Sequence, residues 1–200
     1  MAAPRSAWTR ALYVLALAAL VPLVPFAVIG ELPGERWLVA TSHDALRFGA
    51  TGALLLAGDV LLPIPSSVIG ALLGGRLGFW SGFAFGLLGL CAGHAVGYGL
   101  GRLAPARFTS DLPTAPSISL VLLSRPVPVL AEAVAIAAGA TRMSFARYAA
   151  AAGLGNAAYA GALAANGAAL LPDGLAGPGL ILPLALPVIA YALYRARRRG

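Results

Sequence analysis

Apolar residues fill most of this chain in long blocks, and polar residues are confined to short stretches between them. The first block covers residues 8–30, about 23 residues or ~34 Å of helix, which is long enough to cross a bilayer. It lacks a small-residue cleavage site at its end, so we expect a retained N-terminal transmembrane helix over 1–30. A slightly acidic polar segment, 31–48, follows and is expected on the outer side.

The second apolar block, 49–78, is interrupted in its middle by Pro63 and Pro65. Two prolines two positions apart cannot lie within one straight helix, because each lacks an N–H and disfavours helical geometry in the residue before it. We therefore expect two short helices around a break, forming a re-entrant hairpin near 54–78. Such a break is tolerated at membrane depth only where protein or a water-filled cavity surrounds it.

A second broken block has the same plan. Arg125 precedes Pro126 and Pro128, and Glu132 lies just beyond them, all within an apolar stretch over 118–140. We expect a second re-entrant hairpin near 118–140 that enters from the opposite face of the membrane. Two proline-broken hairpins of opposite orientation are typical of an inverted repeat, a plan in which secondary transporters place a site at the centre of the membrane.

Three unbroken apolar blocks complete the pattern, at 79–101, 144–171 and 178–194. Glycines spaced by four run from just before the first of these blocks to its end, which allows helices to pack closely; they are Gly78, Gly82 and Gly86, followed by Gly89, Gly93, Gly97 and Gly101. The fold class expected is an all-α polytopic membrane protein, with about four transmembrane helices plus the two opposed re-entrant hairpins. Its membrane domain extends over 49–171, and 172–200 forms a last transmembrane helix with a basic tail.

Composition supports this class and excludes others. Hydrophobic residues make up 60% of the chain and charged residues 10%, whereas about a quarter of an average soluble domain is charged. Every one of the 14 basic residues is an arginine, and they form no continuous stripe, so we expect no nucleic-acid partner.

The arginines also indicate the orientation in the membrane. With a cytoplasmic N-terminus, ten arginines fall on cytoplasmic segments and three on outer ones, as the positive-inside rule requires. We therefore expect a multi-pass protein of the bacterial inner membrane with both termini in the cytoplasm. If both broken blocks crossed the membrane fully, Arg102 and Arg107 would lie outside and this bias would weaken.

Three charged residues, Asp59, Arg125 and Glu132, lie close to the proline pairs of the broken blocks. An ionisable group at the centre of a membrane helix costs about 2.5–3.5 kcal/mol, which favours a function for each. Arg125 is suited to hold an anionic group, and a desolvated carboxylate is suited to take up a proton. Alternatively, Arg125 neutralises one acid and pins the hairpins together. The lone His94 is expected to be a packed, hydrogen-bonded residue, with a proton relay as the alternative.

The chemistry of known enzymes is not visible in the sequence. No metalloprotease or serine-hydrolase motif occurs, and two histidines with one cysteine are too few for a convincing metal site. We expect no catalytic residues, no metal and no cofactor.

The run from Asp59 through both prolines to Ser67, together with the run from Ser124 to Glu132, resembles the DedA family of VTT-domain, or SNARE-associated, membrane proteins. The resemblance covers about 49–167. It implies two opposed re-entrant hairpins and the movement of lipids between leaflets, driven by the proton-motive force. Undecaprenyl phosphate is among the lipids that it implies. Ser67 stands where many members carry an acid, and Ala131 where many carry a second arginine.

The expected function is therefore a membrane lipid translocase, of the flippase or scramblase type, that acts on a polyprenyl phosphate or a phospholipid with proton coupling. The residues expected to contact substrate are Arg125, Ser66, Ser67, Pro65 and Pro128, and those expected to couple protons are Asp59 and Glu132. The partners expected are membrane lipids and protons, with a homo-oligomer as an open assembly state. A proton- or cation-coupled transporter of a small solute, and a structural or assembly protein, are the alternatives.

Overall fold

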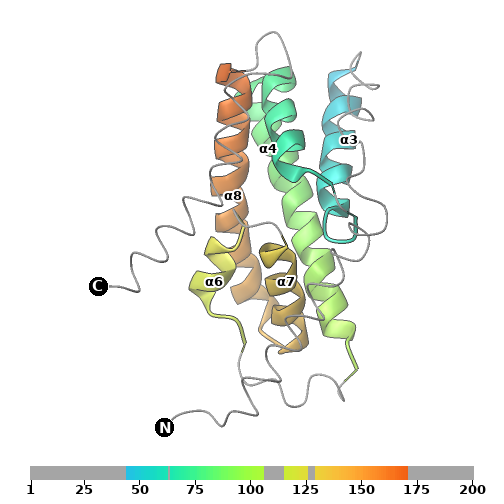
Figure 1. The fold of residues 1–200 in the computed structure, drawn as a ribbon, viewed down its shortest axis with the longest axis vertical. Coiled ribbons are helices and arrows are strands. Elements are labelled where there is room, and N and C mark those ends of the chain that lie inside the picture. Colours follow the sequence, from blue (N-terminus) through green and yellow to red (C-terminus); the bar gives the residue numbers. More distant parts are fainter. Residues whose placement is uncertain (1–43, 63, 106–114, 126–128, 171–200) are drawn as a thin grey trace, which may run out of the picture.

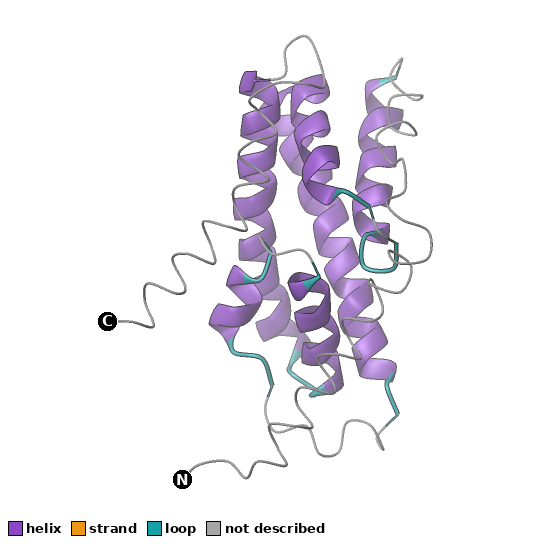
Figure 2. Ribbon diagram, viewed as in Figure 1, coloured by secondary structure: helices purple, strands orange, loops and turns teal. Residues whose placement is uncertain are grey.

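The computed structural model describes residues 44–62, 64–105, 115–125 and 129–170. Every regular element in these ranges is an α-helix, which confirms the all-α prediction for this part of the chain (Figure 2). The predicted N-terminal helix, the predicted C-terminal helix with its basic tail and most of the polar segment 31–48 lie outside the described residues.

The first broken block begins with helix α3, Ala45–Gly58. Asp44 caps it, because its carboxylate accepts hydrogen bonds from the backbone N–H groups of Leu46 at 2.9 Å and Arg47 at 3.3 Å. The helix therefore starts earlier than the boundary near 54 that the sequence predicted. It ends at Gly58, immediately before the segment that contains the first proline pair.

Helix α4, Ser66–Leu103, is folded back on itself at Gly78. The backbone there has φ 75° and ψ 172°, a region that only glycine adopts readily. Gly82 consequently packs on the backbone of Leu73 and Gly74, so residues 66–77 and 79–103 form two antiparallel arms. We call α3 and the first arm of α4, residues 66–77, the first broken pair, and residues 66–77 its return arm. The second arm of α4, residues 79–103, corresponds to the unbroken block predicted over 79–101 (Figure 1).

The second broken block contains α6, Ile118–Leu123, and α7, Leu130–Ala140, and it leads into the long helix α8, Phe145–Leu170. The Ser117 hydroxyl caps α6 by accepting a hydrogen bond from the Leu120 N–H at 3.1 Å. Val129, directly before α7, has φ 66°, an unusual conformation for a β-branched residue. Pro126 and Pro128 lie outside the described residues.

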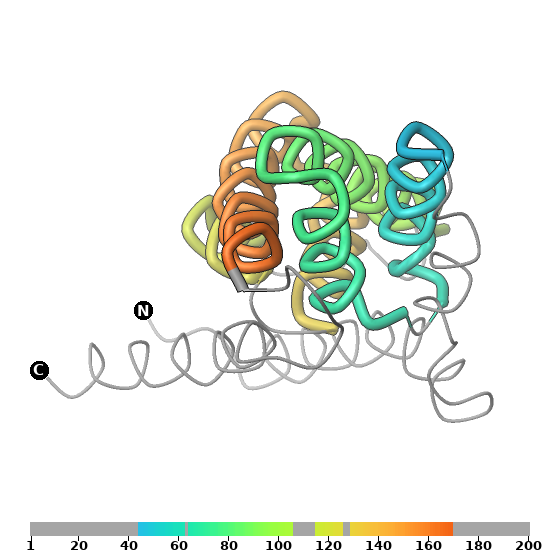
Figure 3. Tube along the Cα trace, turned by 90° about the horizontal axis from the view of Figure 1, so that it is seen from above, coloured from blue at the N-terminus to red at the C-terminus, as the bar shows by residue number. Residues whose placement is uncertain are grey.

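The two broken pairs enter the bundle from opposite ends. In Figure 1, α3 and the first arm of α4 occupy one end, α6 and α7 occupy the other, and both pairs turn near mid-height. The long second arm of α4 and α8 run the length of the bundle beside them. Figure 3, which looks along the bundle, shows α3 and α8 on opposite sides with α4 between them.

Glycines on the two long helices make reciprocal contacts with the return arms. A Cβ added at Gly101 of α4 would overlap the carbonyl oxygen of Ile136 in α7. A Cβ added at Gly167 of α8 would likewise overlap the carbonyl oxygen of Ala71 in the first arm of α4. Each return arm thus packs, backbone against backbone, on the long helix that follows the other broken pair.

The first helices of the two broken pairs, α3 and α6, also pack against glycines of the long helices. A Cβ added at Gly89 would lie 2.5 Å from the carbonyl oxygen of Ala53 in α3, and one added at Gly155 would lie 2.5 Å from that of Leu122 in α6. The two halves of the described chain therefore use the same set of helix contacts, with the direction of the broken pair reversed.

Within the described residues, α4 alone is long and apolar enough to cross a membrane by length and composition. The sequence predicted about four such helices, of which two lie outside the described ranges. The third, α8, has 26 residues and is not identified by this criterion.

Candidate functional site

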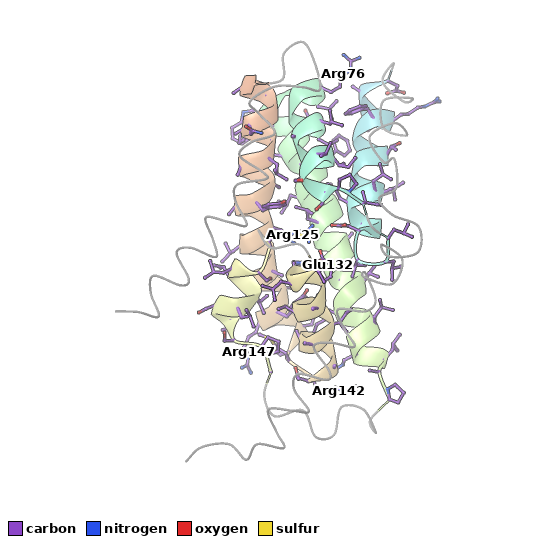
Figure 4. The ribbon with its side chains drawn as sticks, viewed as in Figure 1. Arg76, Arg125, Glu132, Arg142 and Arg147 are labelled. Carbon is purple, nitrogen blue, oxygen red and sulfur yellow. The ribbon has the colours of Figure 1, made fainter. Side chains whose placement is uncertain are left out.

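Asp59, Arg125 and Glu132 meet at one point, although they come from three different helix ends. Arg125 donates from Nη1 to Glu132 Oε1 at 3.1 Å and from Nη2 to Asp59 Oδ2 at 3.4 Å. The side chains of Arg125, Glu132 and Asp59 are only 5%, 7% and 14% exposed. We call these three residues the charge cluster. Figure 4 shows Arg125 and Glu132 together near mid-height of the bundle.

The breaks in the helices place these side chains. Asp59 follows the last residue of α3, and Glu132 lies in the first turn of α7, where helix N–H groups favour a carboxylate. Arg125 comes two residues after α6, which ends with the Ser124 hydroxyl donating to the Val121 carbonyl oxygen at 2.9 Å. Because every break lies at mid-height, the helix ends and their charges converge there.

The charge cluster holds one guanidinium and two carboxylates. When both acids are ionised, the cluster carries a net negative charge in a buried position, which is unfavourable unless a cation or a proton joins it. Arg125 Nε and Glu132 Oε2 are buried and have no hydrogen-bond partner among the described residues. The cluster therefore has unused hydrogen-bonding capacity on both the cationic and the anionic side.

A second layer of polar and aromatic groups surrounds Arg125. His94 Nε2 lies 3.4 Å from Arg125 Nη1, and the Asn156 amide lies 3.2 Å from His94 Nδ1. Tyr148 donates its hydroxyl to the His94 carbonyl oxygen at 3.2 Å. The Tyr159 ring lies 5.7 Å from Arg125 Cζ, which allows a cation–π contact. His94 is buried and hydrogen-bonded, as the sequence predicted.

Of the other residues expected to contact substrate, the structure brings Ser66 to the charge cluster. Ser66, in the first turn of α4, interacts through its side chain with Asp59 and with Tyr159. Pro65 occupies the N-cap position of α4. No hydrogen bond joins the half-buried Ser67 to the charge cluster among the described residues. Pro128 lies outside them.

Asn156 and Tyr159 belong to the site but were not predicted from the sequence. Asn156 is fully buried in α8, and Tyr159 is 9% exposed. An asparagine within an alanine- and glycine-rich span is the one feature that could have indicated this, since polar residues in such helices usually contact another helix. The spacing along α8 does not reveal which partner it contacts.

A crevice of about 150 Å³ lies between the second arm of α4 and α8. His94, Cys91, Tyr148, Phe145 and Asn156 line it together with small residues, and none of the three charge-cluster residues does. Its walls therefore reach the polar layer behind Arg125. Over the described ranges, no group of three or more His, Cys, Asp or Glu side chains is placed to hold a metal ion.

Comparison of the chain with protein-family models, with curated proteins and with solved structures found no match.

Proposed function

We propose that the chain is a polytopic inner-membrane protein in which the two broken pairs are re-entrant hairpins. Residues 79–103 and the 26 residues of α8 would be ~37 and ~39 Å long as helices, enough for a hydrocarbon core of about 30 Å. By contrast, α3, α6 and α7 have 14, 6 and 11 residues. Helices this short reach partway into a bilayer, so each pair returns to the side from which it entered.

The surface of the bundle supports a lipid environment. Large apolar side chains are exposed along its length: Leu54 is 73%, Trp80 77%, Leu88 65% and Leu154 65% exposed. Arginines lie at its ends, with Arg76 at one end and Arg142 and Arg147 at the other (Figure 4). An apolar band between charged ends is the pattern of a membrane domain.

The function that we propose is proton-coupled translocation of an anionic lipid headgroup, of the polyprenyl-phosphate or phospholipid class. The observation that carries it is the sharing of one buried guanidinium by two acids from opposed broken pairs. A guanidinium held in this way is an anion site already present in the protein, and both acids are placed to compete with a substrate anion for it. The resemblance to the DedA family supports a lipid as the substrate.

The proposed coupling follows from this competition. With both acids ionised, Asp59 and Glu132 engage both Nη atoms of Arg125. A proton on one carboxylate removes its charge and weakens its hold on the guanidinium. A phosphate oxygen then takes that edge of Arg125, and the Ser66 hydroxyl is near enough to Asp59 to contribute a hydrogen bond. Proton and anion therefore enter the site together, which limits the change in buried charge.

Translocation in proteoliposomes tests this function. Purified protein is reconstituted with a trace of labelled undecaprenyl phosphate or phospholipid, and the fraction of lipid reached by an external reagent is followed with and without a pH gradient. We expect gradient-dependent translocation by the wild type and its loss in Arg125→Gln and Asp59→Asn. The exposed Arg147→Gln, which removes the same charge from the end of the bundle, is the matched control.

A structural role for the charge cluster is the second candidate, and one observation favours it. Both Nη atoms of Arg125 already have partners, so the cluster is also suited to pin the broken pairs together. The same proteoliposomes separate the two roles. If variants that insert and fold normally all keep full translocation, the cluster is structural. Uptake of a small anion without lipid translocation would instead identify a solute transporter.

A further inference from the structure

Both ring nitrogens of His94 face nitrogen atoms that donate hydrogen bonds. Nε2 lies 3.4 Å from Nη1 of Arg125, and Nδ1 lies 3.2 Å from Nδ2 of Asn156. All three side chains are buried, with His94 4% and Asn156 0% exposed. Because the ring is almost fully enclosed, its protonation has to suit these two direct neighbours.

Only one assignment gives both ring nitrogens a partner of the right kind. A guanidinium has donors and no acceptor, so Nε2 must be the acceptor and the ring proton must lie on Nδ1. The Nδ1–H then needs an acceptor, which the amide oxygen of Asn156 supplies after a half-turn about the Cβ–Cγ bond. That oxygen otherwise has no partner among the described residues.

Cys91 is compatible with the same orientation of the amide. Its sulfur lies 3.5 Å from the same amide atom that faces His94. An oxygen at that position can accept from both the His94 N–H and the Cys91 S–H, because a thiol is able to act as a weak donor as well as a weak acceptor.

We propose that Asn156 holds His94 as the neutral Nδ1–H tautomer, and that His94 is a positioning residue for Arg125. Through Nε2 it accepts a hydrogen bond from the guanidinium and keeps it in place when a carboxylate is protonated or replaced by substrate. This role rests on the proposed translocation. Of the polar side chains that contact the Arg125 nitrogens in the described chain, His94 is the uncharged one, so proton uptake by the acids leaves its contact unchanged.

The surroundings of His94 also disfavour its protonation. Arg125 faces it from the end of α6, Cys91 lies on its own helix, and Tyr148 and Asn156 face it from α8. Asp59 and Glu132 lie beyond Arg125 and already pair with that residue. An imidazolium would therefore place a second cation directly against Arg125.

The tautomer is measured directly by nitrogen NMR. The chain has two histidines, so ¹⁵N-histidine labelling of a His43→Gln protein leaves His94 as the single labelled residue. We expect a protonated Nδ1 and an unprotonated Nε2, unchanged between pH 5.5 and 8. An Nε2–H tautomer, or an imidazolium at neutral pH, would overturn the assignment.

Transport by three variants then tests the positioning role. Gln carries an oxygen that can take the place of Nε2, so His94→Gln should keep most of the translocation rate, whereas His94→Leu should lose about tenfold or more.

Asn156→Asp should stabilise the imidazolium, so that His94 titrates and the rate falls at acidic pH, where the wild type stays active. Equal rates for His94→Gln and His94→Leu, or an unchanged pH profile in Asn156→Asp, would contradict it. If wild-type protein translocates no lipid, the proposed function fails, and the tautomer still decides the assignment.

Discussion

Asp59 and Glu132 come from opposed broken helix pairs, yet both bind the same guanidinium, at 3.4 and 3.1 Å from the Nη atoms of Arg125. The buried cluster therefore has one acid more than it needs for neutrality. A purely structural ion pair would require only one of them. The excess acid is the reason for expecting proton uptake at this site.

This imbalance predicts an unequal effect of removing the charges. Arg125→Gln leaves two buried carboxylates without a counter-charge and should lower the free energy of unfolding by about 3–5 kcal/mol. Asp59→Asn or Glu132→Gln alone leaves a balanced pair and should cost much less. Unfolding in detergent, followed by fluorescence or circular dichroism, measures each effect.

The double variant sharpens this test. Asp59→Asn with Glu132→Gln leaves Arg125 uncompensated, so its loss of stability should exceed the sum of the two single effects. Simple additivity, or a single acid variant as unstable as Arg125→Gln, would contradict the charge balance described above. Arg147→Gln is the control for loss of an exposed arginine.

The turn at Gly78 predicts opposite effects for two glycine substitutions. A Cβ added at Gly78 or at Gly99 meets no atom within 4 Å, so neither is a steric problem. Gly78 has φ 75° and ψ 172°, where alanine should cost about 1–3 kcal/mol. Gly99 is helical, where alanine should stabilise by about 0.8–1 kcal/mol. Thermal unfolding of Gly78→Ala and Gly99→Ala compares them, and equal shifts would exclude the turn.

The reciprocal glycine contacts predict that both halves respond alike. Gly101→Ala and Gly167→Ala each force a methyl group into the backbone of a return arm, so both should be strongly destabilising. At Gly86 the added Cβ lies 3.6 Å from the nearest atom, the Cβ of Ala160, so Gly86→Ala should be tolerated. The measurement is the yield of folded protein after detergent extraction, together with its melting temperature. If Gly167→Ala behaves like Gly86→Ala, the second half is not packed as described.

The break before α7 predicts a stabilising substitution. Val129 has φ 66°, which glycine adopts without strain, so Val129→Gly should leave the melting temperature unchanged or raise it. Val134, buried within α7, is the matched control, because Val134→Gly creates a cavity and weakens the helix. A similar loss of stability in both variants would argue against the conformation at Val129.

Much of the site could be predicted because its residues are of types that apolar helices usually exclude. Prolines in the middle of apolar blocks and charges such as Arg125 in them are costly unless the fold uses them, so sequence alone pointed to them. The meeting of Asp59, Arg125 and Glu132 at mid-height follows from two breaks in opposite directions. The start of α3 at Ala45 was missed because Asp44 acts as a cap inside a segment that its polarity assigned to a loop.

Other parts depend on contacts distant in sequence. Asn156 and Tyr159 lie in α8, where nearly every position is small and apolar, so no periodicity marks the face that meets His94 or Arg125. The glycines spaced by four were predicted to pack helices, but Gly78 forms a turn whereas Gly82 packs on the arm before it. Spacing is the same in both cases, and only the tertiary fold separates the two roles.

In the arrangement that we propose, hairpins from opposite sides of a membrane meet at one charge cluster. Substituted-cysteine accessibility tests it in a Cys91→Ala protein, with Ser67→Cys for the first hairpin and Ser119→Cys, an exposed position in α6, for the second. Impermeant thiol reagents applied to each side of oriented vesicles should label Ser67→Cys from the periplasmic side and Ser119→Cys from the cytoplasmic side. Labelling of both from the same side, or of neither from any side, would contradict this opposed arrangement of the hairpins.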